Sequence, residues 1–162
     1  MNSNTDLISL LKHMPQAIAK IKGNEAYPKL RGTTAFYQTL SGTMVVCRIF
    51  GLPDTDEVCY KPIFAFHIHS GGSCSGNGKD PFAAAMGHYN PHDCLHPYHA
   101  GDMPPLFGVN GMAFCAFLTN RFSVKDIIGR TVVIHSAPDD FSTQPSGNAG
   151  QKIACGVIEK YY

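Results

Sequence analysis

Hydrophobic and polar residues alternate along most of the chain, or form short apolar runs that end at turn residues. Alternation with a period of two is typical of strands that bury one face. Seven segments show one of these patterns, and we predict a strand in each: 17–22, 31–39, 43–50, 63–69, 112–118, 131–135 and 152–158. Between the second and third, Leu40-Ser41-Gly42 predicts a hairpin turn. Because no convincing long helical pattern occurs, we predict an all-β sandwich or barrel.

The beginning of the chain follows a different pattern. Four apolar residues recur there at helical spacing: Leu7, Leu10, Leu11 and Met14. Pro15 would end such a helix, since proline cannot continue the hydrogen-bond ladder. We therefore expect residues 1–15 to be an N-terminal extension, either a short helix or a loose tail, and residues 16–162 to form the β domain.

Two long segments lack a clear strand pattern. Residues 70–111 and 136–150 are rich in glycine, proline, asparagine and aspartate. Loops of this length inside a compact domain usually serve a function, because ordering them costs conformational entropy. We expect the chemistry of the protein to lie in these two loops and in the strands beside them.

Composition narrows the function classes. The 162 residues suit one domain, and 13 basic against 12 acidic side chains leave a net charge of +1. A nucleic-acid partner is not expected, because no basic field is available for phosphates. The N-terminal apolar cluster is too short for a secretion signal or a membrane span. We expect a soluble, cytoplasmic protein whose six cysteines are mostly buried thiols or members of one or two protected bridges.

Histidines are the most informative residues. Six of the eight fall between positions 67 and 99. Alternation places His67 and His69 on the outer face of a strand, opposite Phe64, Phe66 and Ile68. Further candidate ligands lie elsewhere in the chain: His88, His96, His99 and Asp102 in the first long loop, and His135 at the end of an apolar run. Imidazole and carboxylate groups suit copper and zinc, so we predict a metal site.

Several motifs occur together in a recognisable order. They are Phe66-His67-Ile68-His69, Gly87-His88-Tyr89-Asn90-Pro91, His99-Ala100-Gly101-Asp102, Gly129-Arg130-Thr131-Val132-Val133-Ile134-His135, Gly147-Asn148-Ala149-Gly150 and Ala154-Cys155-Gly156-Val157-Ile158. From about residue 16 to residue 158 the chain resembles the copper–zinc superoxide dismutase family, in its bacterial type. The resemblance implies an eight-stranded Greek-key β-barrel, an immunoglobulin-like sandwich with two long functional loops.

The resemblance also implies a role for each candidate residue. His67, His69, His88 and His135 match the copper ligands, and His88, His96, His99 and Asp102 match the zinc ligands. His88 would bridge the two metals. Asp139 matches the carboxylate that hydrogen-bonds one ligand of each metal. Cys74 and Cys155 match the family's disulfide, the alternative being two buried thiols.

The implied function is disproportionation of superoxide to dioxygen and hydrogen peroxide by a redox-cycling copper, with zinc in a structural role. His88 and Lys152 are the implied catalytic residues. Lys152 stands where the family usually carries an arginine. A lysine keeps the positive charge but loses the planar guanidinium fork. We therefore expect intact metal binding, lower activity than is typical of the family and a steep salt dependence.

Two alternatives remain open. In the first, the chain is a low-activity or non-catalytic family member that acts as a copper- and zinc-binding scaffold. In the second, it is an interaction module in which residues 1–14 dock a partner. A homodimer is slightly favoured over a monomer.

The remaining cysteines and histidines are expected to play no part in the site. Cys59 and Cys94 are either a second disulfide or two free thiols. Cys47 and Cys115 alternate with apolar neighbours and are interpreted as core residues. His13 and His92 match no ligand position, so we expect both to be solvated.

Overall fold

The computed structural model describes residues 13–60 and 62–162. The predicted N-terminal helix therefore lies almost entirely outside the described residues, and the division of the chain at residue 15 remains a prediction. None of the helices among the described residues is long and apolar enough to cross a membrane.

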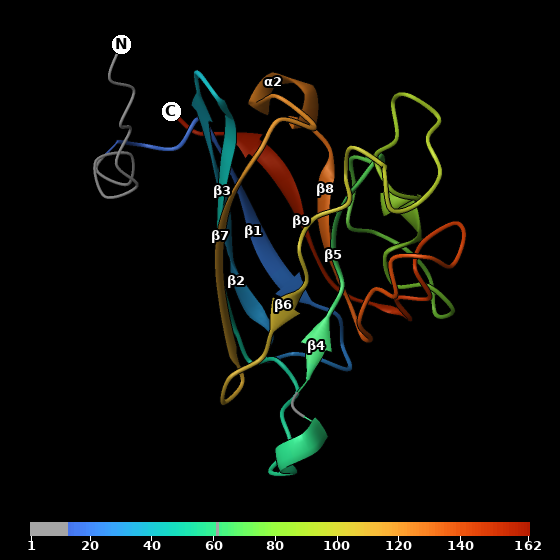
Figure 1. Cartoon of the computed structure of the whole chain (residues 1–162). Helices are drawn as coiled ribbons and strands as arrows, with labels where there is room; N and C mark the ends of the chain where they lie inside the picture. The colour runs from blue at the N-terminus through green and yellow to red at the C-terminus, as the bar shows by residue number, and fades with distance from the viewer. Residues whose placement is uncertain (1–12, 61) are drawn as a thin grey trace.

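The described residues form an all-β fold built on one curled antiparallel sheet (Figure 1). Its strands follow the order β5-β8-β9-β1-β2-β3-β7, and a short pair, β4 with β6, lies apart from it. The strands are β1 (Ala17–Gly23), β2 (Arg31–Thr39), β3 (Gly42–Phe50), β4 (Ile63–Phe64), β5 (Phe66–His69), β6 (Leu106–Phe107), β7 (Met112–Thr119), β8 (Thr131–His135) and β9 (Lys152–Lys160). Six of the seven predicted segments are single strands and the seventh, 63–69, contains two, which confirms the predicted fold class.

Two details differ from the prediction. The predicted strand 63–69 is interrupted at Ala65, so that its first part, β4, pairs with β6 while β5 pairs with β8. β6 was not predicted, because two residues are too few to show alternation. With β4 and β5 taken as two parts of one strand, the described residues contain the eight strands that the resemblance implies.

Three single-turn helices complete the described structure: η1 (Val58–Tyr60), η2 (Ala83–Ala85) and α2 (Val124–Ile127). α2 begins where the Asp126 carboxylate accepts a hydrogen bond from the backbone N–H of Ser123, 2.9 Å away. This bond satisfies a backbone N–H at the start of the helix that would otherwise lack a partner. Helices this short were not expected from the sequence.

The core lies inside the curled sheet, where alternate residues of each strand point inward. β3 illustrates the pattern, since Val45, Cys47 and Ile49 are fully buried while Arg48 is exposed. Cys47 faces Cys115 of β7 in the strand register. Cys47 is confirmed as a core residue, and Cys115 is half-buried at its edge.

The two long loops gather beside β5, at one side of the sheet (Figure 1). Backbone hydrogen bonds attach the first loop to this strand: Ile68 donates to the Gly101 carbonyl at 2.9 Å, and Tyr89 donates to the Ile68 carbonyl at 2.8 Å. The approach at Gly101 is so close that a Cβ there would collide with the carbonyl oxygen of Ile68. The predicted ligands of the first loop are thereby brought to the strand that carries His67 and His69.

Candidate metal centre

Strands β5 and β8 supply three of the four predicted copper ligands. His67 and His69 alternate along β5, and His135 ends the neighbouring strand β8. The prediction of an outward face was incomplete, because all four residues of β5 are buried. The first long loop covers the face that carries the histidines, so the imidazoles lie in the interior of the protein rather than in solvent.

The first loop supplies the remaining ligands. Isolated β-bridges place His88 beside His69 and Asp102 beside His67. Two groups of ligand atoms result, and within each group all atoms lie within 4.8 Å of one another. The copper set is His67, His69, His88 and His135, and the zinc set is His88, His96, His99 and Asp102. Every ligand predicted for the two sites is present, and His88 belongs to both sets.

Hydrogen bonds to one ring nitrogen leave the other free in the copper set. His67 uses Nε2 for a hydrogen bond with Asp139, and His69 Nδ1 lies 2.8 Å from the Met86 carbonyl oxygen. The buried Nδ1 of His67 has no hydrogen-bond partner. Nε2 of His69 and Nε2 of His135 lie 3.1 Å apart. Such a convergence of imidazole nitrogens in a buried site fits a bound cation.

His88 presents its two nitrogens to different sets. Its Nδ1 lies 2.7 Å from Oδ1 of Asp102 and 3.4 Å from Nδ1 of His99, both in the zinc set. Its Nε2 is buried and has no hydrogen-bond partner. The ring centroid of His88 lies 4.0 Å from that of His67 and 5.0 Å from that of His69, on the copper side. One imidazole is therefore oriented to bridge two ions.

The donor types distinguish the two sites. The copper set consists of imidazoles alone, whereas the zinc set adds a carboxylate, whose Oδ2 lies 3.0 Å from Nδ1 of His96. Four ligands with one hard oxygen are typical of zinc, and an all-imidazole set suits copper. The residues present therefore fit both metals.

Burial keeps the ligand imidazoles in the form that binds metal. It lowers the pKa values of His67, His69 and His99, and neighbouring histidines lower them further. The same causes lower the pKa of His135 to about 3. For Asp102, burial raises the pKa, but the hydrogen bond with His88 and the charges of His88, His99 and His67 together lower it below its usual range. Neutral imidazoles and an ionised carboxylate are the ligand forms that a divalent cation requires.

Asp139 connects the two ligand sets through one imidazole of each. Its Oδ2 accepts a hydrogen bond from Nε2 of His67 at 2.8 Å, and its Oδ1 accepts one from Nε2 of His96 at 2.9 Å. Burial raises the pKa of Asp139, but these bonds and one from the Phe141 backbone lower it well below its usual range. Gly147, at a φ of 66°, lies against this carboxylate, where a Cβ would collide with it. The geometry is the one expected from the resemblance.

Two side chains that the sequence analysis missed hold the backbone of the zinc set. Nη1 of Arg121 donates to the carbonyl oxygens of Pro97, His99 and Asp102 at 3.0, 3.2 and 3.3 Å. Gln144, from the second long loop, donates to the His96 carbonyl at 2.7 Å and accepts from the His96 N–H at 3.0 Å. No pattern in the sequence singles out either residue, because their partners are main-chain atoms far along the chain.

Replacing Arg121 with alanine is expected to weaken zinc binding about tenfold, as is typical when a group that orients ligands is lost. The guanidinium fixes the carbonyls of two zinc ligands, so its removal frees the loop that must place them. A chelator competition assay with zinc measures the change. Arg31, whose side chain donates only to the Lys29 carbonyl among the described residues, supplies the control variant Arg31→Ala. Equal zinc affinity in the two variants would contradict the role of Arg121.

A pocket of about 780 Å³ opens over the copper set. His69, His88 and His135 line its floor, and its charged lining residues are Lys79, Asp80, Asp93 and Lys152. Lys152, which by the resemblance stands at the position of the family's arginine, therefore lines the pocket beside the copper ligands. Its Nζ lies 2.7 Å from Oδ2 of Asp80.

The other predicted residues are not among the ligands, although Cys94 lines the pocket. Cys74 and Cys155 form a disulfide, as the resemblance implies. Cys59 and Cys94 are exposed free thiols. The alternative of a second disulfide between them was therefore wrong, and that of two free thiols is confirmed. His13 and His92 are exposed, as expected.

A curled antiparallel sheet with two adjacent ligand sets joined by one imidazole defines a binuclear metalloprotein. The model of the family described as copper/zinc superoxide dismutase (SODC) matches residues 30–158. This chain belongs to that family.

Similar proteins agree with this assignment. The chain is 38% identical over 143 residues to superoxide dismutase [Cu-Zn] 2 of Aquifex aeolicus, a match that covers 78% of each chain. It is 33% identical over 150 residues to the superoxide dismutase [Cu-Zn] of Deinococcus radiodurans, covering 81% of this chain and 78% of the relative. The solved structure of the Cu/Zn superoxide dismutase from Brucella abortus matches with a TM-score of 0.73 and 26% identity, over 88% of this chain and 99% of that one.

Proposed function

We propose that this chain disproportionates superoxide to dioxygen and hydrogen peroxide at its copper site, and that Lys152 is the cation that attracts the anion there. The observation that carries the function is His88, whose ring belongs to both ligand sets. A bound copper ion would supply one-electron redox chemistry, and a bound zinc ion would hold the His88 ring in place.

The residues of the chain contribute position, charge and a proton site. Asp139 and the Met86 carbonyl fix the rings of His67 and His69, so little reorganisation is needed when the site works. Nε2 of His88 is buried and has no other hydrogen-bond partner, which makes it the atom where a proton can be held for transfer. The pocket that His88 lines has a volume of about 780 Å³, which is ample for a small anion.

The experiment that tests this function is reconstitution with both metals. Protein loaded with copper and zinc is expected to bind both ions side by side and to remove superoxide, whereas protein loaded with zinc alone is expected to be inactive. His88→Ala should abolish the activity, because the shared ring is lost. A fully loaded protein without superoxide activity would favour the alternative of a non-catalytic metal-binding scaffold.

Lys152→Arg is expected to raise the rate at low superoxide concentration. A guanidinium retains the charge and presents a planar fork that holds a small anion with two hydrogen bonds. Pulse radiolysis or a competition assay measures the rate, and a salt series shows whether the charge acts at long range. Lys152→Gln is the matched loss of charge and should lower the rate. If all three proteins had the same rate, Lys152 would have no role in catalysis.

We also propose that two copies of the chain associate. The support is an exposed apolar surface on and beside β7, an edge strand of the sheet. It consists of Phe107, Val109, Met112 and Phe114, whose side chains are all largely exposed. Such surfaces commonly mark contacts between proteins. Sedimentation velocity is expected to show a dimer that Phe114→Glu converts to a monomer, and a monomeric parent protein would contradict the proposal.

A further inference from the structure

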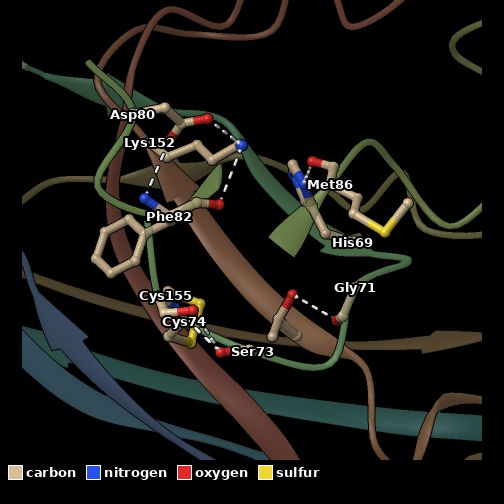
Figure 2. Close-up of a disulfide and its surroundings, with 11 residues drawn as sticks. His69, Gly71, Ser73, Cys74, Asp80, Phe82, Met86, Lys152 and Cys155 are labelled. Atoms are coloured by element: carbon tan, nitrogen blue, oxygen red, sulfur yellow. Dashed lines mark hydrogen bonds and ion pairs between the residues drawn. A yellow bond between two sulfur atoms is a disulfide. The ribbon is translucent and has the colours of Figure 1, made fainter. Parts of the chain in front are cut away.

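Lys152 is held in place by a partner that the sequence analysis did not identify. Figure 2 shows its ammonium between Asp80 and the backbone of Phe82. Nζ lies 2.7 Å from Oδ2 of Asp80 and donates to the Phe82 carbonyl oxygen at 3.2 Å. Two of its three N–H groups are thus engaged with the wall of the pocket, and the side chain is only 15% exposed.

Asp80 is itself held by its own turn. Its Oδ1 accepts a hydrogen bond from the Phe82 N–H at 3.0 Å, and its carbonyl oxygen accepts one from the Asn77 N–H at 2.9 Å. The segment that carries Asp80 is also tied covalently to the strand that carries Lys152, because Cys74 is bonded to Cys155 of β9 (Figure 2). The ion pair therefore joins two segments whose separation is already fixed, and little entropy is lost in forming it.

The pair also determines the charge that an incoming anion meets. The charged side chains lining the pocket, histidines aside, are two lysines and two aspartates, Lys79, Asp80, Asp93 and Lys152. Of these, Lys152 and Asp80 form the only ion pair among the described residues of the pocket lining. An ammonium in contact with a carboxylate attracts a third charge weakly, since the two fields nearly cancel at a distance.

We propose that Asp80 is a positioning residue. Its ion pair holds Lys152 against the pocket wall and so sets how strongly small anions bind at the copper site. The inference rests on the proposed role of Lys152 as the anion-attracting cation. Without the Asp80 carboxylate, the flexible four-carbon stem of the lysine lets the ammonium reach over the pocket. Anion binding then becomes stronger, and the change depends on Lys152 being present.

The test is a double-mutant cycle read by anion binding rather than by activity alone. Azide, a small monovalent anion, is titrated into copper- and zinc-loaded protein and followed through the visible absorption of the copper. Asp80→Asn is expected to tighten azide binding about threefold at low salt, as expected for an unmasked charge near a partly solvated site. Lys152→Gln should weaken azide binding, and adding Asp80→Asn to it should change the affinity little.

A matched control distinguishes the loss of the Asp80–Lys152 ion pair from a simple change of net charge. Asp93→Asn removes one negative charge from the same pocket, where Asp93 makes no ion pair among the described residues. Its effect on azide binding should be less than half that of Asp80→Asn. Metal content and melting temperature confirm that each variant is folded and loaded.

Three results would overturn the inference: unchanged azide affinity in Asp80→Asn, an equal effect in Asp93→Asn, or the same gain with Lys152 absent. The kinetic readout is the rate divided by the superoxide concentration, measured at low superoxide concentration. This ratio should be higher in Asp80→Asn than in the parent protein, and it should fall more steeply as salt is added. Failure of the proposed function has a different signature, since the loaded parent protein would then bind azide without removing superoxide.

Discussion

Asp139→Asn is expected to lower the affinity of the protein for zinc about 10- to 100-fold and to disturb the copper site as well. An asparagine of the same shape has one oxygen and one NH₂ group, so it can accept a hydrogen bond from only one of the two Nε2 atoms that face it. The other ring, of His67 or His96, would meet a donor and must move its proton to Nδ1. A protonated Nδ1 cannot bind a metal, so one ligand is lost. Chelator competition with each metal measures the effect.

The neighbouring residue supplies the control for this prediction. Asp140 is exposed, and its carboxylate accepts hydrogen bonds within its own turn, from Ser142 and Thr143. Asp140→Asn removes the same charge one residue along the chain without touching a ligand. It should leave both metal affinities within about twofold of the parent values, because exposed charges at this distance are screened. Similar losses in the two variants would mean that Asp139 acts only through its charge.

Removing the Cys74–Cys155 disulfide is expected to cost about 4–5 kcal/mol of the free energy of unfolding on the chain-entropy account. The bridge closes a loop with a sequence separation of 81 residues. It also lies in a small apolar cluster with Phe82, Ala85 and Val133. Denaturant unfolding of Cys74→Ala/Cys155→Ala, compared with the parent protein in the metal-free state, measures the loss.

The two exposed thiols provide the comparison for the disulfide. Cys59→Ser/Cys94→Ser also changes two cysteines, but both are exposed and unpaired. Its free energy of unfolding should stay within about 0.5 kcal/mol of the parent, as for most surface substitutions. A loss below about 1 kcal/mol on removing the disulfide would show that the unfolded chain gains little freedom when the bridge is absent.

The strands were predictable from the sequence because alternation records which face of a strand is buried. Alternation does not identify a strand that is too short, and it does not show that a strand is buried on both faces. β6 has two residues, and the burial of both faces of β5 was not predicted because it depends on the loop after the strand folding back over it. Periodicity describes a strand and one neighbouring layer, and it contains no information on a loop that folds back over the second face.

The ligands were predictable for a different reason. Residue type and order identify the histidines and Asp102 because metal coordination requires those chemical groups. The residues that support them are less restricted. Arg121 and Gln144 form hydrogen bonds with main-chain carbonyl and N–H groups. Nearly every residue carries these groups, so the sequence does not show which residues the two side chains contact. The partner of Lys152 was missed because the position of Asp80 depends on how the first loop turns back toward β9.

The placement of the ligands on different kinds of structure has a consequence for assembly. Three copper ligands, His67, His69 and His135, stand on paired strands whose register is set by the apolar core. Three of the zinc ligands, His96, His99 and Asp102, stand on a loop that is attached to β5 by backbone hydrogen bonds and is held further by the side chains of Arg121 and Gln144. The copper ligands of β5 and β8 are thus placed by the sheet, whereas the zinc ligands are placed by the loop and by the side chains that contact its backbone. Disordering the loop should therefore weaken zinc binding more than copper binding, because zinc takes all four of its ligands from the loop and copper takes only His88.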